Sequence, residues 1–128
     1  MCGIVGLVQQ SIPKSPAVEI LRRMAQAIIH RGPDAEGCWA VDGGGIAMRR
    51  LSVIDVEGGQ QPIANESGDI HIVCNGEIYN FRELREKLIS RGHIFKTRSD
   101  TEVALHLYEE EGVKCFASLR GMFAIAIW

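Results

Sequence analysis

The second residue of the sequence is a cysteine, directly after the initiator methionine. Removal of Met1 would leave the Cys2 thiol beside a free α-amine, so that one residue would carry both a nucleophile and a general base. An α-amine has a pKa of about 7.7 to 8.0, and its neutral fraction at pH 7 can accept the thiol proton. Such a residue could act in covalent catalysis, but its position alone favours the plainer interpretation, a small cysteine buried at the start of a strand.

A second candidate for chemistry is the pair Asn75 and Gly76, which follows an apolar run over residues 70–74. An asparagine side-chain amide and the next backbone N–H are two donors of the kind that stabilises a developing oxyanion. Loss of one such donor typically costs about 3 to 4 kcal/mol of transition-state stabilisation. The same dipeptide also forms plain turns, so the pair alone leaves both interpretations open.

Composition excludes several other functions. The 128 residues include 14 Lys and Arg against 16 Asp and Glu, a net charge of −2. This balance predicts one globular domain without the basic surface that nucleic-acid binding needs. The longest apolar stretch, 122–128, is far shorter than the roughly 20 residues of a membrane-spanning helix. The four cysteines form no Cys-x-x-Cys pair and no targeting segment precedes them, so we expect free thiols in the cytoplasm.

Metal binding is the weaker interpretation of the histidines. His30 and Asp34 flank a turn, but one histidine and one aspartate do not make a metal site. The other histidines fall on scattered strand and helix positions, where core or surface histidines are commoner. We therefore expect no metal site in this chain. These scattered residues are His71, His93 and His106.

The elements that must position these residues begin with an apolar run over 2–8, which predicts a buried strand. Apolar residues at helical spacing predict a helix that is capped by Ser15 and ends near His30. Segments 37–41 and 46–54 are expected to pair as a hairpin across a glycine-rich loop.

The second half of the sequence predicts a strand over 70–74 that stops at Asn75, then two helices and a last strand over 122–128. Strands and helices do not alternate regularly, which favours an α+β fold with antiparallel sheets over a doubly wound parallel sheet. The helix boundaries are expected at Asn80 with Glu83 and at Gly92 for the first helix, and at Ser99 with Glu102 and at Gly112 for the second.

Five stretches taken together carry more information than any single residue. They are 1–6 (Met-Cys-Gly-Ile-Val-Gly), 30–34 (His-Arg-Gly-Pro-Asp), 50–55 (Arg-Leu-Ser-Val-Ile-Asp), 75–80 (Asn-Gly-Glu-Ile-Tyr-Asn) and 99–102 (Ser-Asp-Thr-Glu). In this order and at these spacings they resemble the class II glutamine amidotransferase domain. The proline in 30–34 and the stretch 75–80 are most similar to glutamine-hydrolysing asparagine synthetases. The resemblance implies the N-terminal-nucleophile hydrolase fold, a four-layer αββα sandwich of two antiparallel sheets between helices.

The resemblance also implies a role for each matching residue. Cys2 corresponds to the nucleophile, which attacks the side-chain amide of glutamine, forms a γ-glutamyl thioester and releases ammonia. Asn75 and Gly76 correspond to the oxyanion hole. The turn 30–34 is expected to shape a loop over the glutamine pocket.

Four further residues correspond to the part of the family that binds the substrate. Arg50 matches the clamp on the α-carboxylate, and since adjacent strand residues point to opposite faces, its neighbour Arg49 is not expected in the pocket. Asp100 and Glu77 match the positions that hold the α-ammonium. Val53 is expected to give a backbone contact or a pocket wall.

These matches predict that residues 1–128 are part of a glutaminase domain, truncated at its C-terminus, that hydrolyses L-glutamine and supplies ammonia to a synthetase partner. No cofactor is expected in this domain, while ATP and Mg²⁺ are expected in the synthetase domain, which the chain lacks. An exposed terminal strand edge suggests a homodimer. The alternatives are a non-catalytic binding or regulatory domain of the same fold that keeps Met1, and a glutaminase that serves another acceptor such as a sugar acid.

Overall fold

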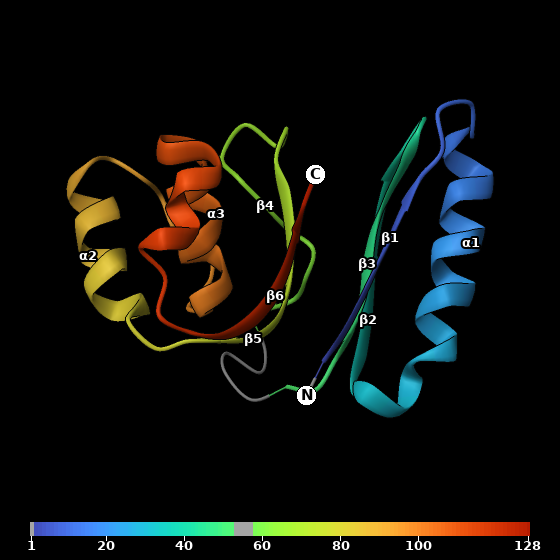
Figure 1. Ribbon diagram of the computed structural model, residues 1–128, viewed down its shortest axis with the longest axis horizontal. Helices are drawn as coiled ribbons and strands as arrows, with labels where there is room; N and C mark the ends of the chain where they lie inside the picture. Colours follow the sequence, from blue (N-terminus) through green and yellow to red (C-terminus); the bar gives the residue numbers. More distant parts are fainter. Residues whose placement is uncertain (1, 53–57) are drawn as a thin grey trace.

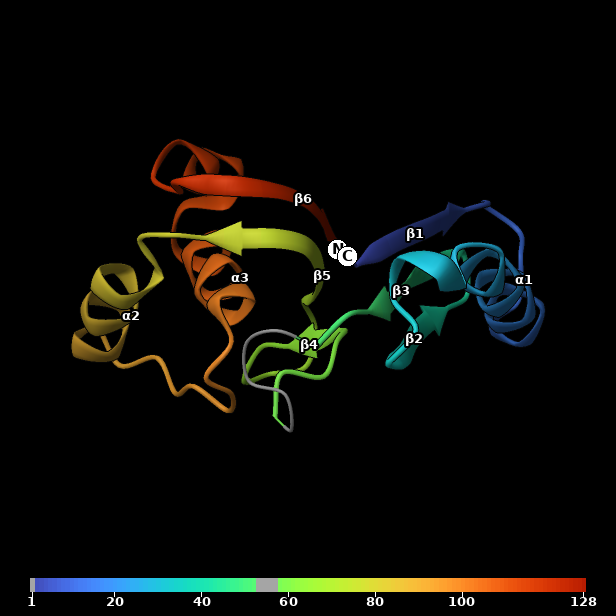
Figure 2. The same cartoon turned by 90° about the horizontal axis from the view of Figure 1, so that it is seen from below.

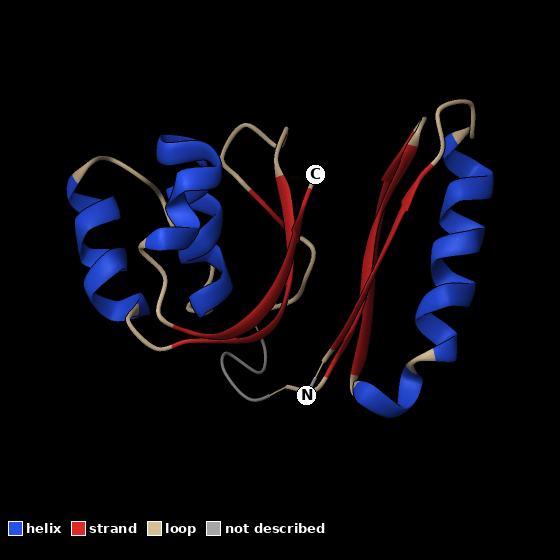
Figure 3. Ribbon diagram, viewed as in Figure 1, coloured by secondary structure: helices blue, strands red, loops and turns tan. Residues whose placement is uncertain are grey.

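Two three-stranded antiparallel sheets face each other, and helices cover their outer faces (Figures 1 and 3). The view from below shows the same four layers (Figure 2). This computed structural model describes residues 2–52 and 58–128. The α+β class and the layer order expected from the sequence are confirmed.

In chain order the elements are β1 (Gly3–Val8), α1 (Lys14–Ala27), the short 3₁₀ helix η1 (Ile29–Arg31), β2 (Ala35–Val41), β3 (Gly44–Arg50), β4 (Ile63–Ala64), β5 (His71–Ile78), α2 (Phe81–Ser90), α3 (Asp100–Glu111), the 3₁₀ helix η2 (Gly112–Ala117) and β6 (Gly121–Ile127).

The first sheet has the strand order β1-β3-β2, and the expected hairpin between β2 and β3 is present. Its turn uses Gly43 and Gly44 at positive φ, and a Cβ on Gly44 would lie 1.9 Å from the Leu7 carbonyl oxygen. No residue but glycine fits there, because both the backbone angle and the space exclude a side chain.

Helix α1 covers this sheet with its fully buried Ala17, Leu21 and Ala25. The prediction that Ser15 caps it is wrong. The helix begins at Lys14, whose backbone N–H donates to Asp42 Oδ1 at 2.8 Å. The first turn therefore receives its acceptor from the hairpin loop, a contact between distant parts of the sequence.

The second sheet has the order β4-β5-β6. We predicted that this strand stops at Asn75, but strand β5 continues to Ile78. The reason is β6, which pairs with it along this whole length and places Asn75 opposite Ala124 and Gly76 opposite Phe123. Strand β6 lies at the edge of the sheet, with β5 as its neighbour in the described chain.

Helices α2 and α3 cover the outer face of this sheet (Figure 1). Ser99 caps α3 as expected, since its Oγ accepts the Thr101 N–H. Helix α2 begins after Asn80, as expected, but the Asn80 side chain does not cap it: Nδ2 donates to Ser118 O and Oδ1 accepts the Arg120 N–H, both at 2.9 Å. Glu102 accepts the backbone N–H groups of Lys96 and Thr97, which precede the helix.

The two sheets meet through a small apolar core made by Ile46 and Met48 of β3 and Val73 of β5. Next to it, the rings of Trp39 in β2 and His71 in β5 stack with centroids 3.9 Å apart. Both contacts join a strand of the first sheet to a strand of the second. Within the described ranges, no helix has the length and apolar character needed to cross a membrane.

Candidate active site

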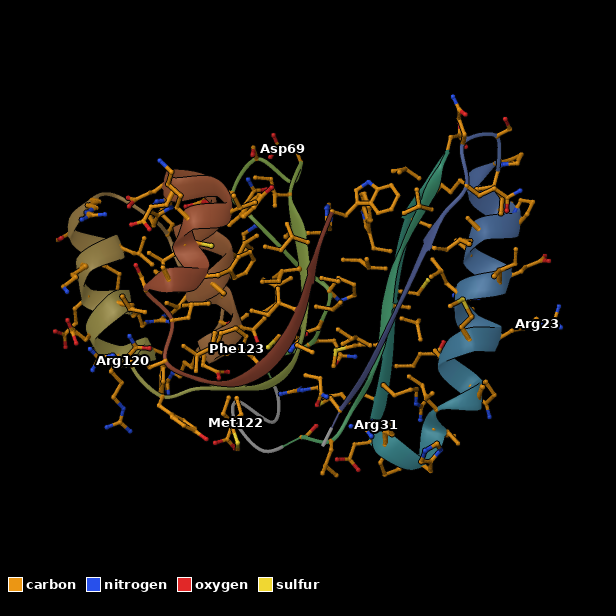
Figure 4. All side chains as sticks on the ribbon, viewed as in Figure 1. Arg23, Arg31, Asp69, Arg120, Met122 and Phe123 are labelled. Atoms are coloured by element: carbon orange, nitrogen blue, oxygen red, sulfur yellow. The ribbon has the colours of Figure 1, made fainter. Side chains whose placement is uncertain are left out.

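A cavity of about 380 Å³ opens between the start of β1, the end of β3, strands β5 and β6, and the first turn of α3. Figure 4 shows Met122 and Phe123 of β6 at the same end of the two sheets as Arg31. The seventh predicted residue, Val53, lies outside the described residues. The other six predicted site residues all line this cavity, namely Cys2, Arg50, Asn75, Gly76, Glu77 and Asp100.

Cys2 is held from both sides by backbone contacts. The Leu51 N–H donates to Cys2 Sγ at 3.3 Å, and the carbonyl oxygen of Cys2 accepts from Arg31 Nε at 3.1 Å. The next residue packs closely on η1 and its neighbours, since a Cβ on Gly3 would lie 2.6 Å from Ile28 Cδ1 and would require that side chain to shift. These contacts fix the thiol at the cavity wall, next to the end of β3.

The turn 30–34 acts from behind the cavity rather than over it, because none of its residues lines the cavity. A Cβ on Gly32 would lie 2.4 Å from the Arg49 carbonyl carbon, so the turn packs directly on the β3 backbone. Asp34 accepts the Ser52 N–H at 2.8 Å. Our expectation of a covering loop is thus wrong: the motif anchors Cys2 and the segment after β3.

Arg49 and Arg50 point to opposite faces of β3, as strand geometry requires. Arg49 donates to Gly32 O at 2.9 Å and Pro33 O at 3.2 Å, and its Nη1 pairs with Glu36 at 3.2 Å. Arg50 lines the cavity and is 5% exposed. One arginine therefore supports the fold and the other supplies positive charge to the cavity wall.

Asn75 and Gly76 lie in the middle of the β5–β6 ladder rather than in a turn. A Cβ on Gly76 would lie 2.0 Å from the Met122 carbonyl oxygen, so this position accepts glycine alone. The Oδ1 atom of Asn75 is buried and has no hydrogen-bond partner among the described residues. An unpaired buried polar atom costs about 1 to 3 kcal/mol, so a ligand that donates a hydrogen bond to this oxygen would recover that free energy.

Asp100 and Glu77 give the cavity its negative charge. Asp100 is 4% exposed at the start of α3, and its Oδ2 accepts the Ile78 N–H at 2.7 Å. That bond leaves Oδ1 near the Ser99 hydroxyl, at 3.5 Å. Glu77 is exposed at the rim. The lining thus offers both charges that a zwitterionic amino acid would need.

A second cysteine, Cys74, also lines the cavity, and the sequence analysis did not assign it a place there. Burial raises the pKa of its thiol to about 12, and the carboxylate of Asp100 adds to the rise. A thiol of this kind is almost entirely protonated at pH 7 and is a poor nucleophile. Its burial distinguishes it from the half-exposed Cys2.

Gln61 is a further cavity residue that the sequence analysis missed. Its Oε1 accepts the Cys74 N–H at 2.7 Å, and its Nε2 donates to Thr101 Oγ1 at 3.3 Å. Nothing in the local pattern around Gln61 indicated this role. Thr101, by contrast, lies in the stretch 99–102 and could have been found from that motif.

The prediction that the histidines are scattered is wrong for two of them. His93 and His106 have ring centroids 4.6 Å apart, with two glutamates beside them. This group does not line the cavity.

The fold defines the class of protein. It is similar to the structure of glutamine phosphoribosylpyrophosphate amidotransferase from Bacillus subtilis complexed with ADP and GMP, with a TM-score of 0.68 and 21% identity over 99% of this chain and 34% of that chain. At this identity the likeness establishes the fold, an α+β sandwich of the N-terminal-nucleophile type.

The chain belongs to the glutamine amidotransferase domain family, whose sequence model matches residues 1–128. It is 48% identical to asparagine synthetase [glutamine-hydrolyzing] 2 of Bacillus subtilis, over all of this chain and 17% of that protein. It is 43% identical to asparagine synthetase [glutamine-hydrolyzing] 2 of Arabidopsis thaliana, over 99% of this chain and 22% of that protein. The chain thus spans about a fifth of the curated relatives it matches, and the resemblance inferred from the motifs is confirmed.

Proposed function

We propose that this chain is a glutaminase module that hydrolyses L-glutamine to glutamate and ammonia through a thioester on Cys2. One observation carries the proposal: a half-exposed thiol at the second residue shares a cavity with a buried arginine, a buried aspartate and an asparagine whose side-chain oxygen lacks a partner among the described residues. In glutamine, the thiol and the asparagine would face the side-chain amide, the arginine would face the α-carboxylate, and the aspartate would face the α-ammonium.

Binding comes first in the proposed mechanism. The Arg50 guanidinium receives the α-carboxylate through two parallel hydrogen bonds, and the carboxylates of Asp100 and Glu77 receive the α-ammonium. Because two of these charged groups are buried, the ion pairs form in a low local dielectric, where they are stronger than in water. Val53 is proposed as an additional wall of this pocket.

Chemistry then follows at Cys2 once Met1 has been removed. The α-amine accepts the thiol proton while Sγ attacks the amide carbon, and the Asn75 amide and the Gly76 N–H stabilise the oxyanion. Collapse of the tetrahedral intermediate breaks the C–N bond, returns the proton to the leaving group and releases ammonia. Water then attacks the thioester, which frees glutamate and restores the thiol.

The destination of the ammonia is the finer part of the proposal. The names of the relatives, glutamine-hydrolysing asparagine synthetases, support a synthetase partner that amidates a carboxylate with ATP and Mg²⁺. This partner would hold those cofactors. The chain itself supplies the residues for the first half-reaction.

Ammonia release from L-glutamine tests the proposal with two matched variants. We expect Cys2→Ala to lose activity down to the background. Cys74→Ala changes the other thiol on the same cavity and should keep most of the activity, because that thiol is protonated. Equal activity in the chain and in Cys2→Ala would refute the mechanism and favour a non-catalytic domain of the same fold.

A further inference from the structure

Two histidines and two glutamates from three segments meet on the helical side of the second sheet. Glu66 lies after β4, His93 lies after α2, and His106 and Glu109 lie on α3. One ligand atom from each lies within 4.8 Å of all the others. We propose that these four residues bind one divalent transition-metal ion of the zinc type, at a site separate from the cavity.

The ligand atoms lie close enough together for one tetrahedral ion to hold them after small side-chain shifts. Zinc bonds to nitrogen and oxygen are about 2.0 to 2.1 Å long, which places neighbouring ligand atoms about 3.3 to 3.4 Å apart. Glu66 reaches one ring with each of its two oxygens: Oε1 lies 3.3 Å from His93 Nδ1, and Oε2 lies 3.4 Å from His106 Nδ1, so the carboxylate must turn slightly to offer one oxygen to an ion between the rings. Glu109 Oε2 lies 3.7 Å from His93 Nδ1 and 2.7 Å from His106 Nδ1, so this last contact must lengthen on binding.

Both rings present the same nitrogen to the centre and turn the other toward a carboxylate. His106 Nε2 lies 3.6 Å from Glu102 Oε1, and His93 Nε2 lies 3.4 Å from Glu110 Oε1. Histidines that bind metals almost always direct their second ring N–H to such a carboxylate or to a carbonyl, which fixes the tautomer. His93 shows this arrangement, whereas His106 Nε2 has no hydrogen-bond partner among the described residues and would need a small shift to reach Glu102.

The carboxylates are also held in place without an ion. Glu109 uses its Oε1 to accept from Asn65 Nδ2 at 2.8 Å, which leaves Oε2 for the centre. Glu66 Oε1 accepts the Ile94 N–H at 3.0 Å. Because these bonds fix the side chains before a metal arrives, binding costs little conformational entropy.

An ion could reach the site from solvent. The Glu66, Glu109 and His93 side chains are 33%, 20% and 16% exposed, whereas His106 is 1% exposed and forms the floor. Mixed imidazole and carboxylate ligands suit zinc and its neighbours in the first transition row, whereas Ca²⁺ and Mg²⁺ prefer oxygen alone.

The alternative is a metal-free cluster in which protons on the histidines balance the carboxylates. The two differ in one measurable respect, since a proton-balanced cluster has no stoichiometric affinity for a metal. Zinc titration by calorimetry after chelator treatment distinguishes them. A Cys2→Ala background is needed, because the thiol and α-amine of Cys2 would themselves chelate zinc.

We expect one zinc ion per chain in this background. The double variant Glu66→Gln, His93→Asn should weaken binding at least tenfold, and both changes are at partly exposed positions that leave the fold intact. His30→Asn, an exposed histidine outside the cluster, should bind as the background does. Co²⁺ in place of zinc should give the spectrum of a tetrahedral ion without a thiolate charge-transfer band.

Failure to bind one zinc ion per chain would overturn the proposal, as would equal affinity in the double variant. A thiolate charge-transfer band would also overturn it, because it would place the ion on a cysteine. The background lacks the Cys2 thiol, so the outcome is independent of glutamine hydrolysis.

Discussion

The cavity and the His–Glu cluster, defined as Glu66, His93, His106 and Glu109, both gather polar side chains from distant parts of the sequence, but they differ in where those side chains point. In the cavity, the Asn75 amide oxygen is buried without a partner among the described residues. In the cluster, the side chains face one another, and neighbouring groups hold both carboxylates. The cavity thus keeps a buried acceptor that a ligand could pair with, whereas the groups of the cluster already pair with one another and with their neighbours.

The largest expected effect separates the thiol from the α-amine. An alanine inserted between Met1 and Cys2 keeps the thiol but moves the free amine away from it. We expect activity to fall by about 10²- to 10⁴-fold, the usual contribution of a general base. Ammonia release measures the loss, and the circular dichroism spectrum should be unchanged. Full activity would show that the α-amine is not the base.

The next largest effect concerns the oxyanion. Asn75→Ala should lower kcat by about 10²- to 10³-fold and change KM little, because the donor acts on charge that develops in the transition state. Steady-state glutamine hydrolysis gives both constants. A rise in KM with unchanged kcat would instead assign Asn75 to substrate binding.

The adjacent arginines form a matched pair. Arg50→Lys should mainly raise KM for glutamine, since a lysine cannot make the two parallel bonds of a guanidinium. Arg49→Lys should leave KM nearly unchanged and lower the free energy of unfolding by about 2 kcal/mol, because it loses charged hydrogen bonds to the turn. Steady-state kinetics and urea unfolding of both variants check this. A raised KM in Arg49→Lys together with a lowered stability in Arg50→Lys would mean that Arg49 binds the substrate and Arg50 supports the fold.

The smallest effect concerns the contact between the sheets. Burial lowers the pKa of His71, although Asp69 opposes the shift. A lowered pKa means that the unfolded chain binds the proton more readily, so this contribution to stability is present above about pH 6.5 and is lost as the pH falls through the folded-state value. His71→Phe should keep the stack on Trp39 and flatten the loss of stability between pH 7 and 5. Urea unfolding of both proteins at several pH values measures this. The same loss of unfolding free energy between pH 7 and 5 in both proteins would contradict the prediction.

The sequence predicted the parts of the site that local patterns carry. The prediction of Cys2 rests on its position together with the family resemblance, and the choice of Arg50 over Arg49 rests on strand alternation together with the same resemblance. The continuation of β5 past Asn75 could not be predicted, because it depends on pairing with β6, some fifty residues later. The role of Gln61 and the meeting of His93 with His106 depend in the same way on tertiary contacts.

Errors at the helix ends have a similar cause. The cap of α1 comes from Asp42 rather than from Ser15, and Asn80 bonds the segment after η2 instead of its own helix. In both cases a side chain from a distant segment replaced the local partner that the pattern favoured. Ser99, whose cap is local, was predicted correctly.

The central claim is that Cys2 is the nucleophile and becomes the first residue of the mature chain. The most direct test is to treat the protein with a glutamine-mimicking electrophile and to determine the intact mass and the modified residue by mass spectrometry. We predict a chain without Met1 that carries one adduct on Cys2. An adduct on Cys74, or a chain that retains Met1 and still reacts, would contradict the account.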